Sequence, residues 1–171
     1  MELINHNERF TYNGKDTGLS VLDFWRFEFS NLNDNHGYVA EFLVAKALGK
    51  ETPDNCVGWT PHDITYNELR IEVKATAYYQ PWKEDGRICF NRRFNISQKN
   101  KNDIYVFSVL LGENEAEANP MKLENWDFYI IPTKTILELC GLHKSMSLSN
   151  IKNITKRVRY DEIKQTIDGL F

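Results

Sequence analysis

Three acidic residues and one lysine in the first half of the chain have types and spacings that suit hydrolytic chemistry. Asp63 is followed nine positions later by Glu72 and, two positions beyond that, by Lys74. Glu41 comes earlier in the chain. Breaking a phosphodiester bond calls for a hard divalent cation that neutralises the phosphate and lowers the pKa of the attacking water. Mg²⁺ is typically held by one or two carboxylates, with its remaining positions left to water and substrate.

The four side chains can divide this chemistry among themselves. Asp63 and Glu72 can supply the carboxylates for one cation, while Glu41 can complete its shell through a water or bind a second ion. The Lys74 ammonium can orient or help to deprotonate the attacking water and stabilise the charge that develops on the phosphate. All four are therefore candidate catalytic residues, and the three acids are candidate metal ligands.

A β-hairpin is expected to position three of these residues. The period of the sequence changes from helical to alternating in residues 64–79, with a tight turn at Asn67 and Glu68. Because side chains alternate across a strand, Glu72 and Lys74 must share a face. Asp63, at the start of the preceding strand, can then lie near one end of the hairpin, within reach of the same ion.

A helix over residues 37–48 is expected to carry Glu41. Asp34 or Asn35 can cap its start, and Gly49 stands at the position where a glycine ends a helix. The segment is apolar nearly all round, so we expect it to be buried. An acidic residue on a buried face needs a partner or a function, and Glu41 is such a residue.

The remaining elements predict a single α/β domain over residues 1–171, with helices packed on a sheet. Ser20 and Asp23 resemble a capping box that opens an N-terminal amphipathic helix from Val21. Further strands are expected at residues 87–91, 102–111 and 126–133, and further helices at residues 133–141 and 161–171.

A second acid-x-lysine copy, Glu162-Ile163-Lys164, serves as an internal control. It lies in a polar helical pattern, where residues two apart point in different directions and cannot share a site. The Glu72 copy lies within a strand, with further acids nearby. Its alternative interpretation is an exposed ion pair on the sheet.

At these residues the sequence resembles the PD-(D/E)XK nuclease superfamily, which includes many restriction endonucleases. Glu41, Asp63, Glu72 and Lys74 match the helix Glu, the strand Asp and the Glu-x-Lys pair of that family in order, with His62 inserted between the Pro and the Asp. The resemblance implies a restriction endonuclease-like αβββαβ core over about residues 35–131, with a mixed central sheet flanked by helices. The N-terminal helix and a C-terminal helical extension lie outside that core. Residues 23–32, 40–48, 71–82 and 125–133 also resemble a group of uncharacterised bacterial proteins with this core.

Two more polar residues near the motif have open interpretations. Gln80 falls on the face of Lys74 if the strand continues that far, where it can contact the scissile phosphate or a water. A polar residue at the sheet edge is the alternative. His62 beside Asp63 suits a base or a ligand, but a residue that caps the strand start is favoured.

Basic residues are concentrated in two segments, although the whole chain has a net charge of −3. Residues 83–101 hold six basic residues against two acidic ones, and residues 144–159 hold five basic residues and no acidic one. Such segments can face phosphates, or they can be ordinary solvated surface. The candidate nucleic-acid contacts are Arg87, Arg92, Arg93, Lys99, Lys152, Lys156, Arg157 and Arg159.

Composition narrows the class of protein. No segment has the roughly 18 apolar residues that span a bilayer, and the three cysteines form no CxxC pair. We expect a soluble cytoplasmic protein that has no membrane association and uses no nucleotide cofactor.

These observations favour a Mg²⁺- or Mn²⁺-dependent endonuclease that acts on DNA, with a role in restriction or defence as one setting. A homodimer would be needed if it cuts both strands. The main alternative is a non-cleaving nucleic-acid-binding or assembly subunit of a restriction or repair complex. A purely structural partner protein is the third, and divalent-ion binding would exclude it.

Overall fold

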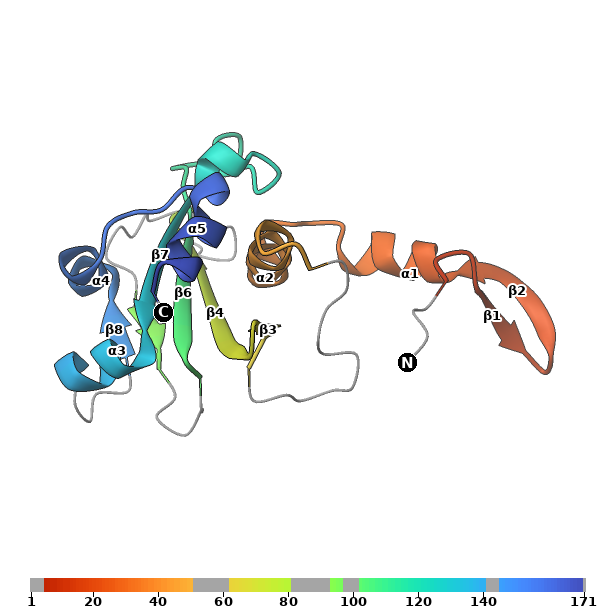
Figure 1. The fold of residues 1–171 in the computed structure, drawn as a ribbon. Coiled ribbons are helices and arrows are strands. Elements are labelled where there is room, and N and C mark those ends of the chain that lie inside the picture. The colour runs from red at the N-terminus through yellow and green to blue at the C-terminus, as the bar shows by residue number, and fades with distance from the viewer. Residues whose placement is uncertain (1–4, 51–61, 81–92, 97–101, 141–144, 171) are drawn as a thin grey trace.

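The computed structural model describes residues 5–50, 62–80, 93–96, 102–140 and 145–170. Within these residues the protein is a mixed α/β structure with five α-helices and a four-stranded central sheet of order β3-β4-β6-β7 (Figure 1). The strand bounds are β3 (Ile64–Tyr66), β4 (Leu69–Ala77), β6 (Ile104–Leu110) and β7 (Trp126–Pro132).

The central sheet is mixed because its pairings differ in direction. β3 pairs antiparallel with β4, β4 parallel with β6, and β6 antiparallel with β7. β6 is buried along its whole length, as its nearly continuous apolar sequence predicts for a strand covered on both faces. The parallel register sets Glu72 beside Tyr105 and Lys74 beside Phe107. The expected α/β class with a mixed central sheet is therefore confirmed.

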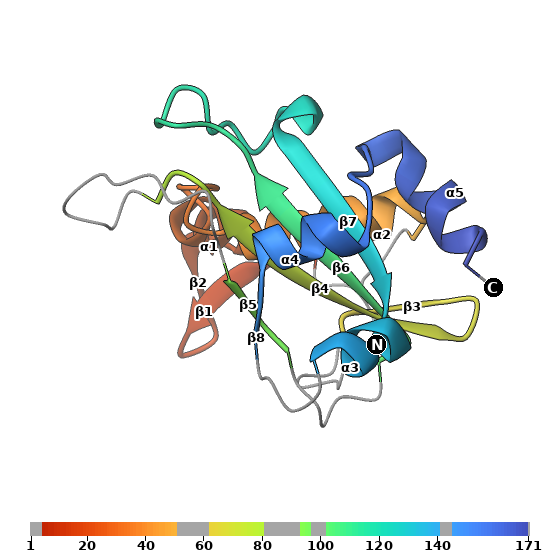
Figure 2. The same cartoon turned by 90° about the vertical axis from the view of Figure 1, so that its left-hand side faces the viewer.

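Helices cover both faces of this sheet (Figures 1 and 2). Val44 and Ile167 belong to the hydrophobic cluster on one face, and Ile136 and Ile151 belong to the cluster on the other. The two layers are built from α2 (His36–Ala47) with α5 (Ile163–Asp168), and from α3 (Thr133–Cys140) with α4 (Leu148–Ile154).

The β3–β4 hairpin has the turn that the sequence predicts. Asn67 and Glu68 both have positive φ angles, 47° and 67°, which is the conformation of a two-residue turn between twisted antiparallel strands. The register pairs Tyr66 with Leu69 and Ile64 with Ile71. This turn fixes where Glu72 and Lys74 fall along β4.

The capping box predicted for the first helix is present, whereas Asn35, the N-cap of α2, makes no capping hydrogen bond with its side chain. In α1 (Val21–Glu28), the Asp23 carboxylate accepts from the Ser20 backbone and the Ser20 hydroxyl accepts from the Asp23 backbone. α2 ends as expected, because Gly49 has a φ of 76° and donates to the Lys46 carbonyl, while Lys50 donates to the Ala45 carbonyl.

The expectation that α2 is buried all round is wrong. Ala40, Leu43 and Val44 are buried against the sheet, whereas Tyr38 is 65% exposed and Phe42 is 56% exposed. A single sheet can cover only one face of a helix, and within the described residues no further layer covers the opposite face of α2. Apolar composition alone therefore overstated its burial.

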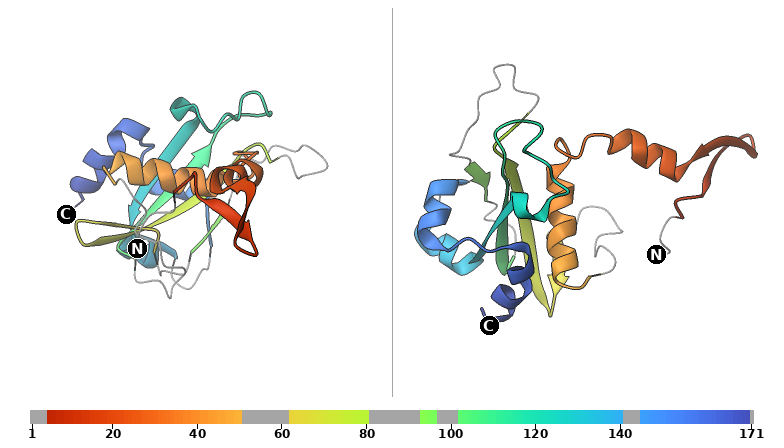
Figure 3. Two further views of the ribbon diagram at one scale, coloured as in Figure 1. Left: turned by 90° about the vertical axis from the view of Figure 1, so that its right-hand side faces the viewer. Right: turned by 90° about the horizontal axis from the view of Figure 1, so that it is seen from above.

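The N-terminal region forms an arm, of which the sequence predicted the helix from Val21 but not the hairpin before it. The strands β1 (Arg9–Tyr12) and β2 (Lys15–Ser20) pair antiparallel and lead directly into α1. The hairpin and α1 extend away from the central sheet in both the front view and the view from above (Figures 1 and 3). No residue of α1 is buried.

The small remaining elements surround the sheet. Most of them were not predicted, and the strand expected at residues 87–91 lies outside the described residues. The helix expected at residues 133–141 is present as α3. The helix expected at residues 161–171 is present as the shorter α5. The other elements are β5 (Arg93–Asn95), which pairs with β8 (Ser145–Ser147), and two 3₁₀ turns, η1 (Leu123–Asn125) and η2 (Tyr160–Glu162).

Candidate functional site

Asp63 lies at the point where the edge strand β3 stops covering β4. Its backbone N–H donates to the Ile71 carbonyl at 3.1 Å, which extends the ladder by one step. Its Oδ2 then accepts from the Val73 backbone N–H at 2.7 Å, a donor that the three-residue β3 does not reach. The carboxylate is thus held rigidly against the middle of β4.

Glu72 and Lys74 lie on one face of β4, as the alternation predicts. The Lys74 ammonium donates to Glu72 Oε1, and the side-chain amide of Asn102 donates to Glu72 Oε2 at 3.2 Å. Glu72 is only 5% exposed, so its carboxylate is held between these two donors and away from bulk water. Lys74 is half-buried and keeps a path to solvent.

Glu41 approaches the same place from α2, which packs on β4. Burial, and then the nearby Asp63 carboxylate, raise the pKa of Glu41 to about 7, and Glu72 adds to this rise. Lys74 acts in the opposite direction. Glu41 is partly buried, as expected, and its role at a metal site stays a prediction. With a pKa of about 7, this carboxyl lies between its two protonation states near neutral pH.

The pKa values of Asp63 and Lys74 are both raised, and neighbouring charges contribute to both shifts. Burial raises the pKa of Asp63 and Glu72 adds to the rise, although the Val73 N–H and the Lys74 ammonium oppose it. Burial alone would lower the pKa of Lys74, but its hydrogen bond to Glu72 and the charges of Glu72 and Asp63 outweigh burial and raise it. Lys74 therefore stays protonated in this arrangement.

The four side chains together form what we call the acid cluster: Glu41, Asp63, Glu72 and Lys74. The cluster brings three acidic side chains and one ammonium together, with Glu72 buried and the other three partly buried. Such a site attracts a cation. Among the described residues, no group of three or more His, Cys, Asp or Glu side chains is close enough to hold a metal ion in the present geometry. Mg²⁺ needs only one or two protein carboxylates, a number that Asp63 and Glu72 can supply.

Gln80 was expected on the face of Lys74 only if the strand continued that far, and the strand does not. β4 ends at Ala77, and Gln80 lies three residues beyond that end. The alternation that sets Glu72 and Lys74 on one face therefore does not extend to it. His62 hydrogen-bonds through Nε2 to Thr65 Oγ1 at 2.8 Å, which agrees with a residue that caps the start of β3.

The acid-x-lysine copy in the C-terminal region behaves as the control predicted. Lys164 does not contact Glu162, but donates to Asp168 at 2.6 Å and to the Tyr66 hydroxyl at 2.8 Å. Glu162 instead accepts from the Arg159 backbone at 2.7 Å. The same three-residue pattern thus gives a shared site on a strand and no shared site on a helix.

The candidate nucleic-acid contacts divide into three groups. Arg93, Lys152 and Lys156 are exposed. Arg159 and Arg157 approach the Asp127 carboxylate, at 3.0 and 3.7 Å, although the Arg157 side chain is itself 53% exposed. Arg159 also donates to backbone carbonyls. The remaining three, Arg87, Arg92 and Lys99, lie outside the described residues.

Two features near the cluster were missed by sequence reasoning. Asn102, the donor to Glu72, is the first residue of the strand expected at residues 102–111, but only the parallel pairing of β4 with β6 brings it to Glu72. Arg70 makes a two-pronged ion pair with Asp103, at 2.9 and 3.0 Å, across the same pair of strands. Neither contact has a local sequence signal.

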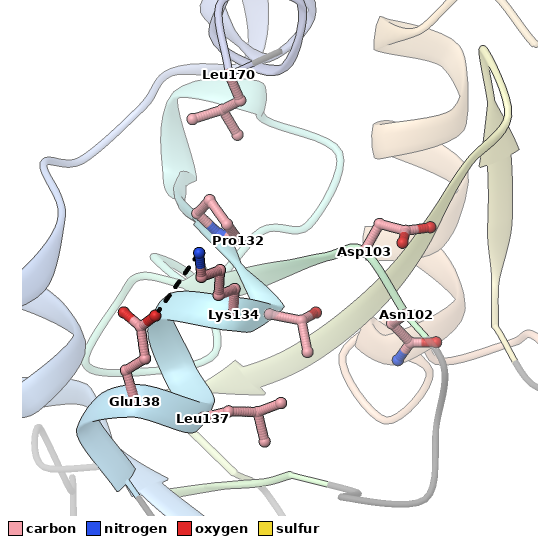
Figure 4. A pocket seen from close by; sticks show the side chains of 8 residues that line it. Asn102, Asp103, Pro132, Lys134, Leu137, Glu138 and Leu170 are labelled. Atoms are coloured by element: carbon pink, nitrogen blue, oxygen red, sulfur yellow. Dashed lines mark ion pairs between the residues drawn. The ribbon is translucent and has the colours of Figure 1, made fainter.

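A pocket of about 660 Å³ lies between the ends of β6 and β7 and α3, and Asn102 lines it (Figure 4). Asn102 Oδ1 and Thr133 Oγ1 are buried there without a hydrogen-bond partner. Lys134 and Glu138 pair at 4.0 Å on its α3 side. Asn102 lines the pocket and also donates to Glu72 of the acid cluster.

Comparisons with family models, with curated proteins and with solved structures find no match to this chain. Among the helices of the described residues, none is both long and apolar enough to cross a membrane. The site therefore has to be interpreted from its own geometry.

Proposed function

We propose that the protein is a metal-dependent nuclease of the PD-(D/E)XK type that hydrolyses phosphodiester bonds in DNA. The observation that carries this proposal is the hydrogen bond of Lys74 to Glu72, with Asp63 and Glu41 close enough to this pair for its charges to shift the pKa of each. A sheet gains no stability from three buried or partly buried acids placed close together, because their mutual repulsion and desolvation both oppose folding. Binding of a divalent cation that also holds a phosphate would offset this repulsion and would explain why the three acids lie together.

The residues present fit Mg²⁺ or Mn²⁺. Asp63 and Glu72 supply hard oxygen ligands, and Glu41 can bind through a water or hold a second ion. A bound divalent cation supplies an activated water and neutralises charge on the phosphate. For Glu72 to act as a ligand, its Oε1 must exchange the Lys74 ammonium for the cation.

Lys74 is proposed to act on the substrate and on the attacking water. Once released from Glu72, its ammonium can reach the attacking water and the phosphate oxygens, where a preorganised positive charge stabilises the transition state. Asn102 keeps Glu72 in place through Oε2 while Oε1 changes partner. Asp63 is held by the Val73 N–H throughout.

The restriction endonuclease-like core is part of the proposal. α2, β3 and β4 follow the order that this core requires, with the acid on the helix before the hairpin. Within the described residues no helix lies between β4 and β6, whereas the αβββαβ order has one before its last strand. Support for the core therefore comes from α2, the hairpin and the mixed sheet.

The exposed side chains of Arg93, Lys152 and Lys156 are proposed to contact the DNA backbone. Their role is one of positioning, because phosphate contacts carry no sequence information. Arg157 and Arg159 are weaker candidates than the sequence suggested, because both approach Asp127. The recognised sequence or structure in the DNA is not part of the proposal.

The test is an incubation of the full chain with plasmid, single-stranded and branched DNA, each with Mg²⁺ or Mn²⁺. We expect cleavage of at least one substrate, which a chelator abolishes and which Asp63→Asn lacks. Asp127→Asn, in a buried acid outside the cluster, is the matched control and should cut like the wild type. Wild-type protein that binds DNA and metal but cuts no substrate would instead support the non-cleaving subunit.

A further inference from the structure

Exposed aromatic side chains are confined to one part of the chain. Among the described residues, every large aromatic side chain that is exposed lies between Phe10 and Phe42. The other exposed large hydrophobic residues of the described chain are Leu19 and scattered aliphatic side chains in its second half. The aromatics on the two helices form what we call the aromatic surface: Phe24, Trp25, Phe27, Phe29, Tyr38 and Phe42.

A ring contact joins the arm part of the aromatic surface to the part on α2. Phe29, at the end of α1, makes an edge-to-face contact with Tyr38 of α2, with ring centroids 5.9 Å apart. Phe27 is 81% exposed on α1, and Phe42 lies on the face of α2 that the sheet does not cover. The arm that carries α1 projects away from the sheet (Figure 3), and its aromatic side chains are between 38% and 81% exposed.

The size of this surface matches a protein interface. An aromatic side chain can bury about 150–250 Å², so six of them at roughly half exposure offer several hundred Å². Phe10 and Tyr12 of the adjoining hairpin bring the area close to the roughly 800 Å² that each partner buries in a standard interface. Monomers rarely leave so large an apolar area in contact with water.

The charge of the arm narrows the choice of partner. Residues 8–29 contain four acidic and three basic side chains, so the arm has no excess of positive charge for phosphates or anionic lipid headgroups. Because phosphates and anionic lipid headgroups are disfavoured, another protein surface is the partner that fits this arm. Aromatic residues are enriched at the centres of such interfaces, whereas charged residues are depleted there.

We infer that the aromatic surface binds the same surface of a second copy of this chain, with the arms of two protomers packed across a two-fold axis. In an isologous contact one patch covers an identical patch, so each copy supplies both the projecting α1 and the exposed face of α2. The inference does not depend on the proposed nuclease activity.

The test measures the molar mass of the full chain by light scattering and sedimentation over a range of protein concentrations. We expect a dimer at high concentration that dissociates on dilution, and a melting temperature that rises with concentration. The double variant Phe24→Ser, Phe27→Ser should be monomeric with an unchanged circular dichroism spectrum, because no residue of α1 is buried. The control Leu139→Ser, in an exposed residue of α3, should remain dimeric.

A second variant, Phe42→Ser, tests the body half of the same surface. It should weaken the dimer without loss of the fold, because Phe42 lies opposite the buried face of α2. A wild-type chain that is monomeric at the highest concentration would overturn the inference, as would a Phe24→Ser, Phe27→Ser variant that dimerises like the wild type. A monomer that sediments with lipid vesicles would assign the surface to a membrane instead and would also overturn it.

Discussion

The sheet holds two buried carboxylates whose surroundings differ in the balance of charge. Glu72, on β4, is 5% exposed, and Asp127, on β7, is 7% exposed. Asp127 is approached by Arg159 at 3.0 Å and by Arg157 at 3.7 Å, both from the segment after α4. Glu72 accepts from the Lys74 ammonium, and the charges of this pair also act on Asp63 and Glu41.

This difference separates a structural acid from a candidate functional one. Burial raises the pKa of Asp127 and outweighs the opposing effect of Arg157 and Arg159, but the charged neighbours that act on this carboxylate are all cations. Around Glu41 the neighbouring carboxylates add to the effect of burial instead of offsetting it. An acid whose charge is balanced locally needs no ligand, whereas a cluster with excess negative charge is arranged for a cation that arrives from solution.

Replacement of Lys74 should have the largest effect. Lys74→Ala removes the group that orients the water, so we expect cleavage to fall by about 10²-fold or more. Divalent-ion binding should persist or tighten, because Glu72 loses its competing partner. A gel-based cleavage assay and a metal titration on the same preparation measure the two quantities.

The control for that prediction is Lys164→Ala, in the second acid-x-lysine copy. Lys164 binds Asp168 and Tyr66 on the surface, so its loss should leave cleavage nearly unchanged. If an active wild type is available and Lys74→Ala cuts as fast as it does, the role assigned to Lys74 is wrong.

Substitution at the Asp127 site should change the stability of the fold and not the cleavage activity. Arg159→Ala removes the closer guanidinium from Asp127 and the hydrogen bond to the Trp126 carbonyl, which should cost about 1–3 kcal/mol of unfolding free energy. Denaturant unfolding measures this loss, with the exposed Lys156→Ala as control. Equal unfolding free energies for Arg159→Ala and the wild type would show that Arg159 does not balance Asp127.

Glu41 should make stability depend on pH. Its pKa is raised from 4.5 to about 7 in the folded chain, so between these values the folded state binds more protons than the unfolded state. The free energy of unfolding should therefore fall as pH rises through this window. Glu41→Gln should remove this dependence and stabilise the protein above that window, on the order of 1 kcal/mol after allowance for partial exposure. Parallel pH profiles for variant and wild type would contradict the assignment.

The exposed lysines should have the smallest effect, confined to DNA binding. Each true phosphate contact contributes about 0.9 to the slope of log affinity against log salt on duplex DNA. The slope should fall by about this amount for Lys152→Ala and for Lys156→Ala. Lys134→Ala, an exposed lysine outside the basic segments, is the control. An unchanged slope for the first two variants would remove them from the interface.

Local patterns were enough to predict the elements that form the acid cluster. The alternation around Glu72 and Lys74 and the turn at Asn67 and Glu68 are short-range signals, and the structure has both. The acid on the apolar helix signalled that Glu41 has neighbours. These features are encoded within a few residues of where they act.

The remaining features depend on contacts between distant segments, which a single sequence does not reveal. Asn102 reaches Glu72 only through the parallel pairing of β4 with β6. Arg159 resembles a phosphate contact in sequence because its partner, Asp127, lies 32 residues away. The exposure of Tyr38 and Phe42 was missed because composition shows that a helix is apolar but not how many layers cover it.

The most direct test of the account is a calorimetric titration of the full chain with Mn²⁺ and Mg²⁺. Four proteins are compared: the wild type, Asp63→Asn, Glu72→Gln and, as a buried acid outside the cluster, Asp127→Asn. The account predicts saturable binding to the wild type and to Asp127→Asn, and loss of that binding in the two cluster variants. Absence of divalent-ion binding in the wild type, or binding to Asp63→Asn and Glu72→Gln as tight as to the wild type, would contradict it.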